Sequence, residues 1–188
     1  MAFDAILNNF DRLPLGKLWK YELETEVPLG NLGNLLFRKD SGSPVAIDQS
    51  ITSYDPHTLP DKFDEYSDNL VSIVQECMEA LEAGTVSEAF HEISATLGRV
   101  FGVEMGNNRM IHVQRGFIKS MKAACGLSSG KIQELYETVR SLFADVILNF
   151  PDITERSVGL HLINLQFINT LLSNIRNSTE NILPSLNE

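Results

Sequence analysis

The chain has 188 residues, of which 43% are hydrophobic and 21% are charged, and its formal net charge is −10. This composition is too apolar for a disordered chain, and two cysteines are too few for a disulfide-rich scaffold. A chain of this length buries about 70% of the surface that its unfolded form exposes. It therefore needs neither a metal nor disulfides to fold.

The N-terminal residues and the two cysteines predict an intracellular, cytoplasmic protein. Asp4 stands where a secretory signal would carry a basic residue. Cys77 and Cys125 each lie within an apolar-periodic stretch, where a reduced cysteine acts as a small hydrophobic residue and stays protonated. Residues 157–175 form a long uncharged run, but the histidine, asparagines and glutamine in it predict that it does not span a membrane.

Residues 1–54 predict a short helix followed by a small β-rich arm. The helical spacing before Pro14 predicts an amphipathic helix with the apolar residues Phe3, Ile6, Leu7, Phe10 and Leu13. Apolar and charged residues alternate over 17–27, a pattern typical of a strand with one buried face. Residues 35–37 and 45–47 flank a loop with glycine and proline, so two more short strands are expected. The polar stretch that ends at Pro60 predicts a linker, placed at 55–60.

From residue 61 onward the apolar pattern is helical and predicts five helices. The first ends at Gly84, and Thr85 with Glu88 forms a capping-box pattern that predicts the start of the second. The third helix is expected over about 108–124. The fourth begins near Ser128 and ends before Pro151, and its expected core residues are Ile132, Leu135, Val139, Leu142, Phe143, Val146 and Ile147. The fifth begins near 152 and ends near 184.

The predicted fold class is therefore mainly α. Short connections between the helices favour a compact five-helix bundle over 61–183, preceded by the N-terminal helix and the β-rich arm. Residues 184–188 are expected to form a C-terminal tail.

No motif in the sequence predicts catalysis, a metal or a cofactor. The loop before Lys131 resembles the end of a phosphate-binding loop, but Ile132 stands where a hydroxyl residue is needed. The pair His91 and Glu92 would need a second histidine at Ala95 to bind zinc. We therefore expect a non-enzymatic protein without cofactors. A catalytic group assembled by the fold from scattered residues is the alternative that stays open.

Charge is distributed unevenly along the chain. Residues 55–92 contain ten acids and one base, whereas residues 99–131 contain six bases and one acid. On a helical wheel, one side of the third helix carries the bases Arg109, Arg115, Lys119 and Lys122 together with His112. The opposite side is apolar, so the helix can pack on the bundle with its bases outward. Arg99 and Lys131 lie beyond its two ends and would support it.

A line of outward bases predicts contact with phosphates, and salt screening lets a local basic patch attract a polyanion despite the negative total. The alternative is that the acidic block neutralises this helix, within one subunit or between neighbouring subunits. No aromatic residue lies on the basic side, so base stacking is not expected there.

The fifth helix predicts self-association. It has a heptad-like apolar stripe and no charge on the rest of its surface over 157–175, as expected of a helix with contacts on both sides. The stripe consists of Val158, Leu165, Ile168, Leu172 and Ile175. A central core helix in a monomer explains the pattern equally well.

An acidic helical bundle with a few outward bases is similar in architecture to the coat subunits of rod-shaped viruses. The outward bases opposite an apolar side, together with the uncharged fifth helix, predict a non-enzymatic, self-associating protein that packs or coats an anionic polymer, here single-stranded RNA, as a homo-oligomer. The alternative is a protein interaction module, such as a regulatory or host-directed adaptor. It would bind another protein through the β-rich arm or through Phe3, Ile6, Leu7 and Phe10.

Overall fold

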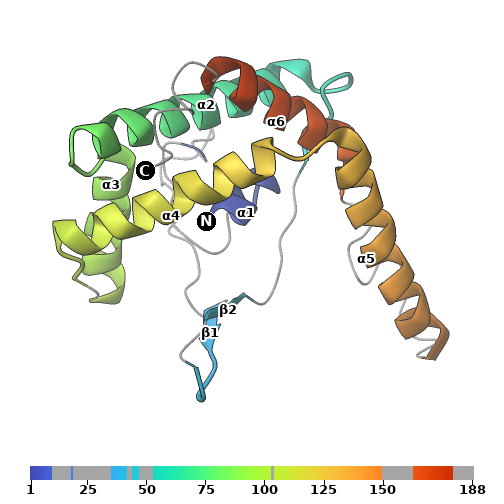
Figure 1. Cartoon of the computed structure of the whole chain (residues 1–188), viewed down its shortest axis with the longest axis horizontal. Helices are drawn as coiled ribbons and strands as arrows, with labels where there is room; N and C mark the ends of the chain where they lie inside the picture. Colours follow the sequence, from blue (N-terminus) through green and yellow to red (C-terminus); the bar gives the residue numbers. More distant parts are fainter. Residues whose placement is uncertain are drawn as a thin grey trace.

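The computed structural model describes residues 1–9, 18, 35–41, 44–46, 53–102, 104–149 and 163–179, and they are mainly helical (Figure 1). The helices are α1 (Ala2–Ile6), α2 (Pro60–Glu82), α3 (Glu88–Phe101), α4 (Asn107–Cys125), α5 (Ser129–Asn149) and α6 (Leu165–Thr179). The strands are β1 (Leu35–Phe37) and β2 (Pro44–Ala46). The predicted helical bundle is confirmed.

The start of α2 is fixed by the residues predicted to be a linker. Pro60 stands at the first helical position, where its missing N–H costs nothing. Asp55 Oδ1 accepts hydrogen bonds from the backbone N–H groups of His57 and Thr58, and Asn164 donates to Asp55 Oδ2. The bond from the His57 N–H is the main cause that lowers the pKa of Asp55. This segment therefore ties the start of α2 to the start of α6.

The turn between α2 and α3 differs from the predicted one. Gly84 has a φ of 68°, which suits a residue just past a helix end. The cap of α3 is Ser87, whose side chain accepts a hydrogen bond from the Phe90 N–H, so the capping box predicted at Thr85 is wrong. The Thr85 hydroxyl instead donates to the Ala80 carbonyl.

The next two boundaries agree with the sequence. The helix predicted over 108–124 is α4, and it ends at Gly126. The hydroxyl of Ser128 accepts a hydrogen bond from the backbone N–H of Lys131 and so caps the start of α5.

The core lies where α2, α4 and α6 pack together. Phe167 of α6 contacts Phe63 and Tyr66 of α2, with ring centroids 5.7 and 5.9 Å apart. Phe90 of α3 packs on Phe117 of α4 in the same way, at 5.6 Å. Such tilted and edge-on aromatic pairs contribute about 0.5–1.5 kcal/mol each beyond the area they bury.

Helix α1 belongs to this core. It packs against α4 and α6, and Ala2, Ala5 and Leu7 are buried. The Tyr66 hydroxyl donates a hydrogen bond to the Ala5 carbonyl at 2.5 Å. The N-terminal helix is thus integrated with the helices that follow it, rather than separated from them as part of an arm.

The β-rich arm is not supported. Within the described residues, strand structure is limited to β1 and β2, which pair antiparallel with Leu36 opposite Val45. The strand predicted over 17–27 lies outside the described residues apart from Leu18, which is buried in a turn. A ladder of two three-residue strands is smaller than the three-stranded arm expected from the alternation.

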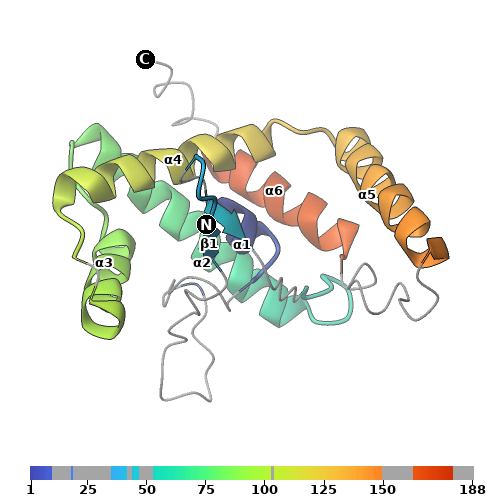
Figure 2. The ribbon, with the colours of Figure 1, turned by 90° about the horizontal axis from the view of Figure 1, so that it is seen from below.

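Helix α5 departs most from the expected bundle. Figures 1 and 2 show it extending away from α2 and α4 at the end of α4. Its main contact is with α6, and Ile132 in its first turns is buried. Leu135, Val139 and Leu142 were expected in the core, but they are exposed. The sequence pattern identified an apolar side of the helix correctly but not what covers it.

Candidate nucleic-acid interface

The orientation of α4 is fixed by Gln114, which is fully buried. Its Nε2 donates to the carbonyl oxygens of Cys77 and Thr85, and its Oε1 accepts from the Ser87 N–H at 2.8 Å. These bonds join the middle of α4 to the α2–α3 turn. Because Gln114 points into the core, the opposite side of α4 points outward.

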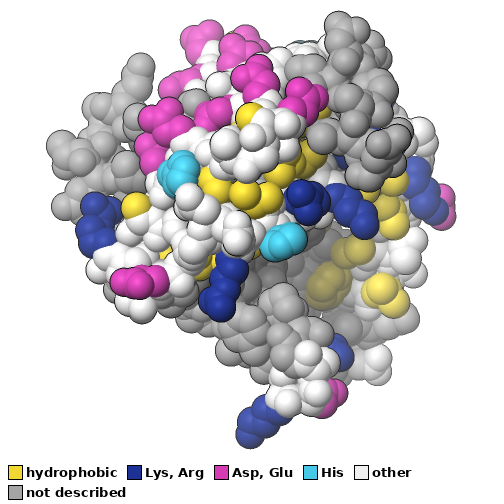
Figure 3. Space-filling model, turned by 60° about the vertical axis from the view of Figure 1, so that its left-hand side comes forward, with side chains coloured by type: hydrophobic (Ala, Val, Ile, Leu, Met, Phe, Trp, Pro, Cys, Tyr) yellow, Lys and Arg dark blue, Asp and Glu magenta, His cyan; other side chains and the backbone are white. Residues whose placement is uncertain are grey.

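That outward side carries the predicted bases, which we call the basic row: Arg109, His112, Arg115, Lys119 and Lys122. Arg109, His112, Arg115 and Lys119 are exposed, and Lys122 is half-buried. Figure 3 shows Lys and Arg side chains along α4, with the acids of α2 gathered above them on the same face. The single aromatic residue of α4, Phe117, is buried, so it is not available for stacking.

Three bases of the row have no acidic partner among the described residues. Arg109, Arg115 and Lys119 form no ion pair or hydrogen bond with a described side chain. Lys122 has an interaction partner in the structure and is therefore not one of these three unpartnered bases. Neutralisation by the acidic block of the same chain is therefore not seen for these three side chains.

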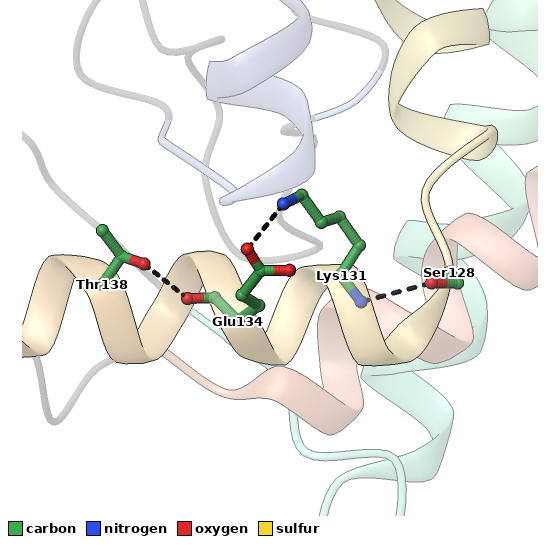
Figure 4. Close-up of polar contacts among 4 residues, drawn as sticks. All are labelled: Ser128, Lys131, Glu134 and Thr138. Atoms are coloured by element: carbon green, nitrogen blue, oxygen red, sulfur yellow. Dashed lines mark hydrogen bonds and ion pairs between the residues drawn. The ribbon is translucent and has the colours of Figure 1, made fainter.

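The two supporting bases differ. Arg99 lies exposed in the last turn of α3 and has no ion-pair partner among the described residues. Lys131 lies in the first turn of α5, where its Nζ is 2.7 Å from Glu134 Oε1 (Figure 4). Both side chains of this pair are about half exposed, so the attraction is weak. The spacing of three residues on one helix could have identified this pair from the sequence.

The acids form a surface of their own beside the basic row. On α2 the exposed acids share the side opposite the core, and Glu88 and Glu92 extend this acidic surface onto α3. The exposed acids of α2 are Asp61, Asp64, Glu65, Asp68, Glu79 and Glu82. Glu76 is half-buried and accepts a hydrogen bond from the Ala89 N–H, which joins α2 to α3. The charge segregation of the sequence is thus preserved on the surface.

The carboxyl end of α4 has a feature that the sequence patterns did not indicate. The guanidinium of Arg176, on α6, donates to the carbonyl oxygens of Cys125 and Leu127. A cation at the end of a helix satisfies free carbonyl groups and interacts favourably with the helix dipole. Burial raises the pKa of the Cys125 thiol, and nearby Arg176 acts in the opposite direction. Cys125 is therefore a poor thiolate nucleophile at neutral pH.

The residues predicted for self-association pack inside the chain. Ile168, Leu172 and Ile175 of α6 are buried in the core, and Leu165 is half-buried. Val158 lies outside the described residues. The apolar stripe is thus accounted for by contacts of α6 within the chain, as in the alternative of a central core helix.

The N-terminal residues predicted to bind a partner are placed in a similar way. Leu7 is buried and Ile6 is half-buried against the core. The side chain of Phe3 and all of Phe10 lie outside the described part of the structure. In the described residues, α1 therefore offers no exposed apolar side for another protein.

Among the described residues, no three histidine, cysteine or acidic side chains are grouped as metal ligands would be. No helix in that part of the chain is long and apolar enough to cross a membrane.

A comparison with protein-family models and with curated proteins finds no match for this chain. Its function is therefore inferred from the geometry and charge of α4.

Proposed function

We propose that this chain is a non-enzymatic helical protein that binds an anionic polymer, single-stranded RNA, through the basic row and associates with further copies of itself. The observation that carries the proposal is the set of exposed bases Arg109, Arg115 and Lys119, which have no acidic partner among the described residues. They lie on a helix held in place by Gln114.

The geometry favours a strand over a compact anion. Arg109 and Lys119 are ten positions apart on one helix, which corresponds to about 15 Å along its axis. Charges spread over that length can contact several phosphates of one strand in turn. A single line of bases, bordered by the acidic surface of α2, supports a single strand as the ligand.

A salt titration with a matched pair of variants tests the proposal. The variant R109Q/R115Q/K119Q should lose most of the affinity for a fluorescent single-stranded RNA. Three phosphate contacts correspond to a slope of about −2 in log affinity against log salt, and this slope should disappear.

The control is R38Q/K39Q/K62Q, which removes the same charge from exposed positions away from α4. It should retain both the affinity and the slope. If the two triple variants lose affinity equally, or if the first binds RNA as the unchanged protein does, the basic row is not the RNA site.

A further inference from the structure

Helix α5 has an exposed apolar side that the bundle leaves without a described partner. Leu135, Val139 and Leu142 have 45%, 38% and 64% of their surface exposed. At 100° per residue, these three side chains fall within about 60° of one another on the helix. We call them the α5 seam. Phe143, at one edge of the seam, is half-buried.

Four of the five charged residues of α5 form two ion pairs outside the seam, and Asp145 leaves the helix with a net charge of −1. Lys131 pairs with Glu134 at 2.7 Å, and Arg140 lies 3.8 Å from Glu137. An apolar seam bordered by paired charges is the pattern of a helix that packs against another helix.

The charge distribution favours a second copy of this chain as the other helix. The chain carries a net charge of −10, and the acidic surface of α2 and α3 would repel another copy. The two bases and two acids that pair on α5 cancel, and with Asp145 the helix carries a net charge of only −1. A second copy therefore meets much less like-charge repulsion at α5 than at the acidic surface of α2 and α3. Burial of Leu135, Val139 and Leu142 against the same residues of the second copy removes apolar surface from water on both sides.

The size of the seam limits how strong this contact can be. A stable interface buries about 800 Å² on each partner, and three half-exposed aliphatic side chains over two helical turns supply less. The contact is therefore weak between free molecules. Two copies bound to the same strand, however, meet at a much higher effective concentration.

We infer that α5 pairs with α5 of a second copy when both copies occupy one polymer, and that this contact makes binding cooperative. The cooperative binding to RNA rests on the proposed function, whereas the exposed seam is observed in the protein without RNA.

The test measures binding of each variant to a short and to a long RNA, and the control substitution also lies on α5. The variant L135N/L142N should bind a short RNA, with room for one copy, as tightly as the unchanged protein does. On a long RNA the unchanged protein should bind cooperatively, by about tenfold or more, and the variant should not. The control L148N replaces a leucine that is 80% exposed and lies roughly opposite the seam, so it should keep the cooperativity.

Two further measurements distinguish a failure of the α5–α5 contact from a failure of RNA binding. Sedimentation of the protein without RNA at high concentration should show weak self-association that L135N/L142N abolishes and L148N retains. That result supports the α5–α5 contact even if no RNA binds. In that case the proposed RNA binding is wrong, but the contact between copies is not. Cooperativity that survives in L135N/L142N overturns the inference. So does a fall of many degrees in the melting temperature of L135N/L142N alone, because the seam would then be packed within the chain, against a segment such as 150–162.

Discussion

At the scale of single residues, one arginine joins two helices. Arg176 on α6 donates hydrogen bonds to the carbonyl groups of Cys125 and Leu127, where α4 ends and the turn to α5 begins. This contact orients the last turn of α4, which carries Lys122. Removal of the guanidinium leaves partly buried carbonyl groups without a donor.

Replacement of Arg176 by methionine should therefore lower the free energy of unfolding by about 1.5–3 kcal/mol, the usual contribution of hydrogen bonds to a charged group. Urea denaturation measures this loss. The control is Arg140→Met, since Arg140 is about half exposed and lies 3.8 Å from its acid, so its loss should stay below about 1 kcal/mol. Equal losses in the two variants would show that Arg176 does not support α4.

At the scale of elements, the sequence predicted most helices because their apolar stripes repeat at helical spacing and glycines mark their ends. The basic side of α4 could be predicted for the same reason. The partner of a stripe could not, because periodicity shows that a side is apolar but not what covers it. Leu172 thus lies in the core, although a partner was considered for it, and Leu142 is exposed, although the core was expected. The role of Gln114 depends on backbone atoms far away in sequence, so no local pattern revealed it.

The joint between α4 and the α2–α3 turn can be tested by Gln114→Met, which keeps the length of the side chain but removes its polar atoms. The Ser87 N–H and the Cys77 carbonyl would then lose a buried partner, so the free energy of unfolding should fall by about 2 kcal/mol or more. Gln133→Met on the exposed side of α5 is the matched control and should change it by less than about 0.5 kcal/mol. If Gln114→Met melts like the unchanged protein, these hydrogen bonds do not hold α4.

At the scale of the whole molecule, the acidic surface and the basic row lie on one face (Figure 3). Gln114 bonds to Cys77, Thr85 and Ser87, so the middle of α4 lies beside the end of α2 and the start of α3, which carry Glu79, Glu88 and Glu92. Asp61, Asp64 and Glu65 lie about 18–24 Å further along α2 from Cys77. Salt screens charges beyond about 10 Å at 0.1 M, so only the near acids should oppose an approaching strand.

The variant E79Q/E88Q/E92Q should therefore bind RNA more tightly than the unchanged protein at about 0.1 M salt. The variant D61N/D64N/E65Q removes the same charge at a distance and should have a smaller effect. Fluorescence anisotropy at two salt concentrations measures both, and the difference between them should shrink as salt rises. Equal gains would mean that net charge alone, and not the place of the acids, controls binding.

The fold protects its two described cysteine thiols from solvent to different degrees. Cys125 lies at the last turn of α4 beneath Arg176, so release of one side chain and fraying of one turn can bring its sulfur to solvent. Cys77 is fully buried on α2. Its sulfur lies 3.3 Å from the Ser87 hydroxyl, and its carbonyl oxygen accepts a hydrogen bond from Gln114. Its exposure requires three helices to separate, and openings of that size have free energies near that of global unfolding. The chain therefore contains one natural reporter of local fraying and one of cooperative disassembly.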